Sequence, residues 1–147
     1  MKEKEDERLQ TPKFLQQLVN TNFQKCADDE LVELAVRAKV IVSVYTSQEW
    51  MTPFEQTMVK GFQHYLEQMD DELEKRSIVL VDVRELIDGH KAEIAEVLKK
   101  CNLLYLMRLA EELETVTQMP GEHGSFHTLK DLVYTEIAGR SGSDIGS

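Results

Sequence analysis

Several residue types that would narrow the function are scarce in this chain of 147 residues. Its two cysteines, Cys26 and Cys101, lie far apart without a CxxC spacing, which excludes a disulfide scaffold and a cysteine-rich zinc site. Three prolines and seven glycines are too few for the many tight turns of an all-β domain. No apolar run is long enough for a membrane span, and the charged N-terminus has no signal-peptide pattern. We therefore expect a cytoplasmic protein with two buried thiols.

Basic residues are also scarce relative to acidic ones. Lysine and arginine number 17 against 27 aspartates and glutamates, a formal charge of -10. This charge repels nucleic-acid phosphates and anionic lipid headgroups, so we expect no nucleic-acid partner. An alternative is that the acidic surface imitates nucleic acid and occupies a basic groove of another protein.

Apolar residues are plentiful and recur with helical spacing. The composition is 41% hydrophobic and 30% charged, which is typical of a globular helical chain. We predict an all-α, single-domain bundle of five or six helices over residues 11–138. Residues 1–10 form a charged lead-in, and residues 139–147 form a Gly/Ser tail that has nothing to pack.

Two helix starts stand out in the pattern. Asp28 or Asp29 can begin a helix that ends near Tyr45 and is apolar on two edges, which predicts a position at the centre of the domain. The sequence TPFE, residues 52–55, combines a threonine cap, a proline at the first helical position and a reciprocating glutamate. Asp88 can cap a further helix that carries Ile94.

Two stretches leave the secondary structure open. Residues 39–45 and 78–83 are rich in valine and isoleucine, which favour strands, yet their apolar residues also fit a helical period. An α/β fold with short strands at these two places is therefore the alternative to the helical bundle.

Aromatic residues are rare, and three large side chains gather near the TPFE start. Tyr45, Trp50 and Met51 can close over the helix as a hydrophobic staple. Alternatively they can form an exposed anchor for a protein partner, because tryptophan, tyrosine and methionine are favoured at interface centres. The valine edge formed by Val32, Val36 and Val40 is a further candidate surface wherever it proves to be exposed.

Two histidines, His123 and His127, lie four residues apart after a break at Pro120. On one helix they could share a metal ion, but Gly124 keeps His123 in the preceding loop, and we predict no metal site. The sequence HTLKD, residues 127–131, resembles the HxLKG motif of histidine phosphotransfer domains. By that resemblance His127 would accept a phosphoryl group and Lys130 would attract it, whereas Asp131 replaces the small glycine of the motif.

A second resemblance extends over residues 34–124. A hydrophobic helix ending in Tyr45, a capped long helix, EVLKKC and then HG follow in an order similar to the tumour-necrosis-factor-induced protein 8 family. That family consists of helical proteins that carry lipid. The resemblance implies a protein that binds a lipid or another small apolar ligand.

No phosphate-binding loop, nucleophile elbow or metalloprotease motif occurs in the sequence. Acidic runs such as residues 70–74 are typical of a solvated helix face rather than of paired catalytic carboxylates. We predict a non-enzymatic protein without a cofactor, acting as an interaction or regulatory module for a protein partner. Homodimerisation is compatible with this prediction.

Overall fold

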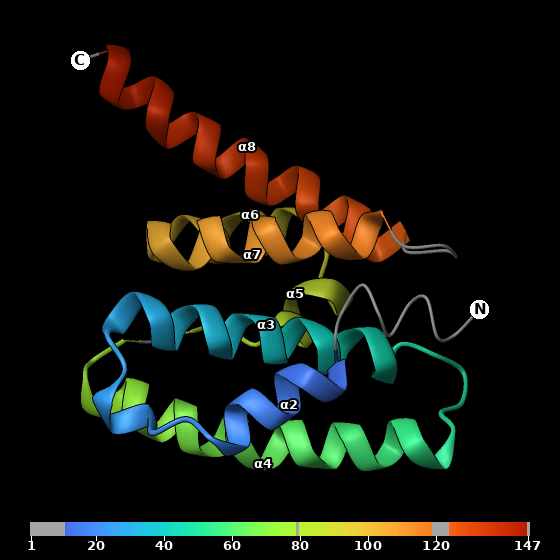
Figure 1. Ribbon diagram of the computed structural model, residues 1–147. Helices are drawn as coiled ribbons and strands as arrows, with labels where there is room; N and C mark the ends of the chain where they lie inside the picture. The colour runs from blue at the N-terminus through green and yellow to red at the C-terminus, as the bar shows by residue number, and fades with distance from the viewer. Residues whose placement is uncertain (1–10, 79, 119–123, 147) are drawn as a thin grey trace.

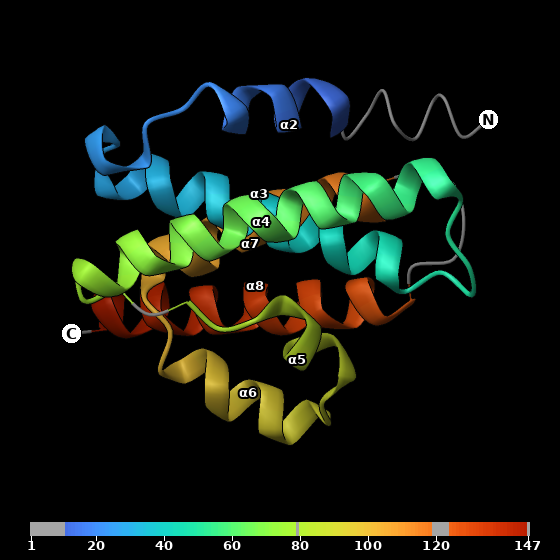
Figure 2. The same cartoon turned by 90° about the horizontal axis from the view of Figure 1, so that it is seen from below.

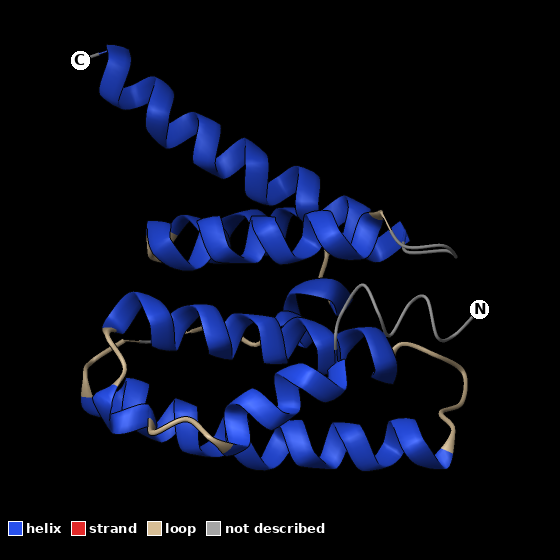
Figure 3. Cartoon of the chain, in the orientation of Figure 1, coloured by secondary structure: helices blue, strands red, loops and turns tan. Residues whose placement is uncertain are grey.

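The described part of the chain consists of helices joined by short connections. The computed structural model describes residues 11–78, 80–118 and 124–146, with side chains for 12–78, 80–118 and 124–140. Within these ranges there are seven α-helices and one 3₁₀ turn, and no strand (Figure 3). Their bounds are α2 Thr11–Val19, η1 Phe23–Lys25, α3 Asp28–Thr46, α4 Pro53–Lys75, α5 Val83–Asp88, α6 Lys91–Lys99, α7 Leu103–Thr117 and α8 Gly124–Gly146.

Helix α3 lies at the centre, as its two apolar edges predict. It runs between α4 on one side and α7 on the other, and α8 crosses α7 on the far side from α3 (Figure 1). Seen from below, α2 lies at one edge of the molecule, whereas α5 and α6 lie at the opposite edge (Figure 2). Val32, Val36 and Val40 are all buried, so α3 contacts its neighbours around most of its circumference.

The alternative with strands is wrong. Residues 39–45 lie inside α3, and residues 80–82 precede α5 without belonging to a helix or a strand. Valine and isoleucine lower helix propensity only slightly, and burying them on every side of α3 outweighs that cost. The described part of the second stretch has no neighbouring strand to pair with, and residues 80–82 form a connection that leads into α5 at Val83.

The number of helices exceeds the predicted five or six because the region after α4 is divided twice. Asp82 caps the first piece, α5, its side chain accepting a hydrogen bond from the Arg84 backbone N–H at 3.1 Å. Asp88, predicted to cap the helix that carries Ile94, is instead the last residue of α5, and that helix, α6, begins after His90. Asn102 then caps α7 by accepting from the Leu104 backbone N–H at 2.7 Å. Each cap restarts a helix by satisfying free backbone N–H groups.

The predicted capping box at the start of α4 is confirmed. The Glu55 backbone N–H donates to Thr52 Oγ1 at 3.1 Å, and the Thr52 backbone N–H donates to Glu55 Oε1 at 2.9 Å. Pro53 occupies the first helical position. This pair of bonds fixes the direction in which the chain enters α4.

One arginine ties three elements together at the other end of α4. The Arg76 guanidinium donates to the carbonyl oxygens of residues 23, 24 and 26 at 2.7 to 3.2 Å. It also donates to the carboxylates of Asp28 and Glu72, each at 2.9 Å. Arg76 therefore joins the η1 turn and the first turn of α3 to the C-terminus of α4, and charge-assisted bonds of this kind are stronger than neutral ones.

A second arginine plays a similar part in α8. Arg140 Nη2 donates to the carbonyl oxygens of Leu98 and Lys99 at the end of α6, both at 3.0 Å, and its Nε pairs with Glu136 at 2.8 Å. Helix α8 continues to Gly146, although we expected a Gly/Ser tail from residue 139. The prediction did not account for Arg140, whose side chain donates hydrogen bonds to carbonyl oxygens of α6, a helix distant in the sequence.

We expect Arg76→Met to lower the midpoint of thermal unfolding by several degrees, because three carbonyl oxygens and two carboxylates lose one shared donor. Hydrogen exchange should accelerate first in residues 22–27. Lys75→Met, which removes a neighbouring exposed cation, is the matched control. Equal midpoints and equal exchange rates for the two variants would show that Arg76 has no such role.

Candidate functional site

The turn between α3 and α4 exposes two large aromatic side chains. Trp50 is 68% exposed and Phe54 is 51% exposed, the two highest values among the exposed large hydrophobic residues in the described ranges. We call these two residues the Trp50–Phe54 surface. Trp50 is among the candidates from the sequence, whereas Phe54 is not. Its position at the second residue of α4 places it beyond the end of the core.

The backbone beneath this surface is held firmly. Met51 is half-buried against the core, and its carbonyl oxygen accepts a hydrogen bond from Gln56 Nε2 at 3.1 Å. The capping box of Thr52 and Glu55 restrains the next residues. The fourth helical residue is thus a glutamine, so a polar bond replaces the apolar contact of a hydrophobic staple.

Two other predicted candidates belong to the core. Tyr45 is only 3% exposed, so it offers almost no surface to a partner. The valine edge of Val32, Val36 and Val40 is likewise buried. Neither forms an exposed surface, because α3 is covered on faces that the sequence could not assign to solvent or to a neighbouring helix.

The histidine segment is described only from Gly124 onwards, so His123 lies outside the described residues. His127 is exposed on the first turns of α8. Lys130 turns towards α7, where its Nζ donates to Thr117 Oγ1 at 3.2 Å and lies 3.6 Å from a carboxylate oxygen of Glu114. The positive charge of Lys130 is therefore partly balanced by the Glu114 carboxylate on α7. Phosphoryl transfer through His127 remains a prediction.

The thiols and the metal-binding residue types offer little chemistry in the described ranges. Burial, assisted by the nearby Glu30, raises the pKa of the Cys26 thiol to about 11, and burial also raises the pKa of Cys101. Both thiols are thus protonated at neutral pH and are weak nucleophiles. No three histidine, cysteine, aspartate or glutamate side chains of the described residues are grouped as metal ligands.

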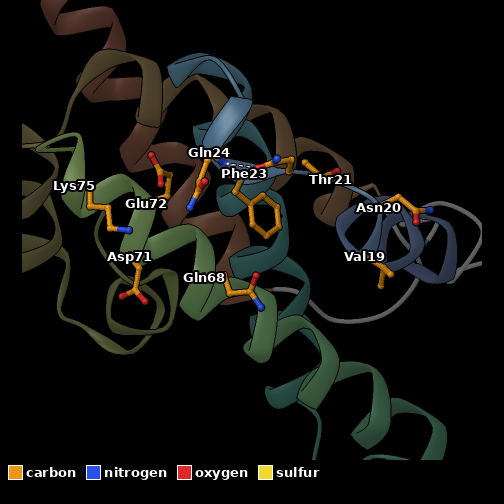
Figure 4. Close-up of a pocket in the computed structure, with 10 residues that line it drawn as sticks. Val19, Asn20, Thr21, Phe23, Gln24, Gln68, Asp71, Glu72 and Lys75 are labelled. Carbon is orange, nitrogen blue, oxygen red and sulfur yellow. Dashed lines mark hydrogen bonds between the residues drawn. The ribbon is translucent and has the colours of Figure 1, made fainter.

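A polar groove of about 520 Å³ lies between residues 19–24 and the C-terminal half of α4 (Figure 4). Helix α4 contributes Gln68, Asp71, Glu72 and Lys75, while the opposite wall carries amide and hydroxyl side chains around the Phe23 ring. The carboxylate of Glu72 is already bonded to the Arg76 guanidinium. The groove can offer hydrogen bonds to a polar ligand, but its lining does not suit an apolar one.

No protein-family model, no curated protein and no solved structure matches this chain. The resemblances to phosphotransfer domains and to the tumour-necrosis-factor-induced protein 8 family therefore remain predictions. Among the described residues, no helix has both the length and the apolar character needed to cross a bilayer.

A group of charged side chains is partly buried where α3 meets α7. Arg37 Nε lies 3.7 Å from Glu112 Oε1, and Arg108 approaches Glu33 at 4.0 Å and Glu111 at 3.2 Å. The pKa of Glu112 is raised to about 7, chiefly by burial, with Arg37 opposing the rise and the two neighbouring glutamates adding to it. Near neutral pH the Glu112 carboxyl is therefore only partly ionised in the folded protein.

Glu112 should make the folded state less stable as pH rises from about 4.5 to about 7. Below this window the carboxyl is protonated in both states; within it the folded protein holds the proton more tightly, and above it the folded state bears the cost of a buried charge. We expect Glu112→Gln to gain stability relative to the wild type across this window, by at most about 3 kcal/mol. Denaturant unfolding at pH 5, 6, 7 and 8 measures the difference.

The control is Glu93→Gln, the same replacement at an exposed position on α6, which measures the effect of removing a carboxylate from the surface. A stability difference between Glu112→Gln and the wild type that stays constant from pH 5 to pH 8 would contradict the assigned titration.

Proposed function

We propose that this protein is a non-enzymatic interaction module whose protein partner docks on the Trp50–Phe54 surface. The observation that carries the proposal is the exposure of these two aromatic side chains, 68% and 51%, on a turn that is held by a capping box. Tryptophan in particular is enriched among residues that dominate binding energy, because a rigid ring covers much apolar area at a small cost in entropy.

The chemistry around this surface supports binding rather than catalysis. Glu49, Gln56 and Thr57 are exposed beside the aromatic pair and can serve as a polar rim. The formal charge of -10 favours encounter with a basic partner over an acidic one. Two buried, free thiols suit the reducing cytosol, where we place the protein.

We expect a Trp50→Ala/Phe54→Ala variant to bind its protein partner at least about thirtyfold more weakly than the wild type, because loss of a hot-spot anchor costs about 2 kcal/mol or more. Cross-linking with the wild-type protein in its native host identifies the partner. Isothermal titration with the purified partner then measures the affinities. Both replaced side chains are mostly solvent-exposed, so thermal unfolding should change little.

The matched control is Met107→Ala/Tyr134→Ala, which removes two large side chains that are 49% and 44% exposed elsewhere. If both double variants bind equally well, the partner does not use the Trp50–Phe54 surface. Light scattering of the wild type and of both variants tests whether the partner is a second copy of the chain.

A further inference from the structure

A second surface, which we call the α4 trough, runs beside α4 on the side of its connection to α5. It consists of two adjoining cavities of about 450 and 320 Å³ that share Asp70 as a lining residue. The first is lined mainly by polar side chains of α3 and α4 together with Asp82 and Arg84. The second has an apolar floor made by Leu73, Ile78 and Leu80.

A reversal of the chain after α4 creates this trough. Ser77 has a φ of 61°, the left-handed conformation that usually ends a helix at glycine. The Ile78 backbone N–H donates to the Leu73 carbonyl and the Ser77 backbone N–H to the Glu74 carbonyl, both at 2.9 Å. This pair of bonds is the Schellman arrangement, which brings Ile78 against Leu73. The chain then runs back past α4 towards α5 (Figure 2).

Residues 80–82 place their side chains on alternate sides, as in an extended chain. Ile78 and Leu80 line the trough, whereas Val81 lines a separate small cavity beside α5 and α6. The Val81 carbonyl accepts a hydrogen bond from the buried Tyr105 hydroxyl at 2.9 Å. Tyr105 therefore anchors the segment from the core side and keeps it in a fixed position.

One backbone edge of this segment is open. In an extended chain the N–H and C=O of one residue point to the same edge, and the N–H and C=O of the next residue point to the opposite edge. Tyr105 occupies the edge that carries Val81, so the N–H and C=O of Leu80 and the N–H of Asp82 point to the other edge. The Asp82 carbonyl is not part of this edge, because it accepts hydrogen bonds from the backbone N–H groups of residues 85 and 86 at the start of α5. The backbone N–H groups of Leu80 and Asp82 donate to no other residue in the described ranges. Such an edge can pair with an incoming extended chain.

The charges around the trough are predominantly negative. Four carboxylates line it, against the two cations Lys39 and Arg84. Lys39 pairs with Asp70 at 3.2 Å, while Arg84 pairs with Asp88 at 3.2 Å and donates to Ser47 Oγ at 2.8 Å. Both cations are thus engaged within the protein. Glu67 and Glu74 are exposed on α4 and remain available to attract positive charge.

We infer that the α4 trough binds an extended segment of a protein partner in which apolar and basic side chains alternate. The backbone of that segment pairs with the N–H and C=O of Leu80 and with the N–H of Asp82. Its apolar side chains cover Ile78 and Leu80, and its basic side chains meet the carboxylates on α4. The trough follows about eleven residues of α4, or about 17 Å, which accommodates about five residues of an extended chain. This inference shares with the proposed function the premise of protein binding, but it uses a different surface.

The test uses a fluorescent heptapeptide of alternating lysine and isoleucine as the probe for the full-length chain. We expect saturable binding in fluorescence anisotropy and slower hydrogen exchange at Leu80 and Asp82. Glu67→Lys/Glu74→Lys should weaken binding about tenfold or more, since it reverses charges next to the probe. The control Glu93→Lys/Asp131→Lys makes the same change of net charge on α6 and α8, so it measures general attraction alone.

The contribution of the backbone is tested with two N-methylated forms of the probe. Methyl groups on alternate residues block one hydrogen-bonding edge, so one of the two registers should lose binding and the other should retain it. Equal effects of the two charge reversals, or unchanged exchange at Leu80 and Asp82, would overturn the inference. The Trp50→Ala/Phe54→Ala variant should bind the probe as the wild type does, which separates this result from the test of the Trp50–Phe54 surface.

Discussion

The whole architecture depends on the enclosure of α3. Its apolar side chains occur on nearly every face, so no orientation on a surface would keep them from water, and α4 and α7 must cover it from both sides. The remaining helices then pack around this three-layer centre. The enclosure also explains the charged group at the border of α3 and α7, where Arg37 and Glu112 lie close to the core and the carboxyl has a raised pKa.

Short helices around α3 have many backbone carbonyl groups that find no partner within their own helix, and long side chains donate hydrogen bonds to some of them. Arg76 collects carbonyl oxygens near the start of α3, and Arg140 does the same at the end of α6. These bonds hold together segments that are distant in the sequence. The same rigidity benefits the two proposed binding surfaces: a capping box supports Trp50, and Tyr105 anchors the segment that borders the α4 trough.

The two surfaces differ in the way they would recognise a protein. The Trp50–Phe54 surface offers apolar area with a polar rim, so its strength would come from desolvation of aromatic rings. The α4 trough combines an apolar floor, an acidic wall and an open backbone edge, so its selectivity would come from charge and strand direction. Neither surface requires a reactive side chain, which agrees with the protonated state of both thiols at neutral pH.

Local chemistry in the sequence determined the helical class, the central position of α3 and the start of α4, because periodicity, caps and proline act within a few residues. Tertiary packing decided the rest. The sequence of residues 39–45 by itself is compatible with either a strand or a helix, and burial against α4 and α7 selects the helix. Tyr45 and Trp50 are equally apolar in the sequence, yet the first is buried and the second exposed. The α4 trough depends on a chain reversal at Ser77, a serine in a conformation that usually requires glycine, and on contacts between residues distant in sequence.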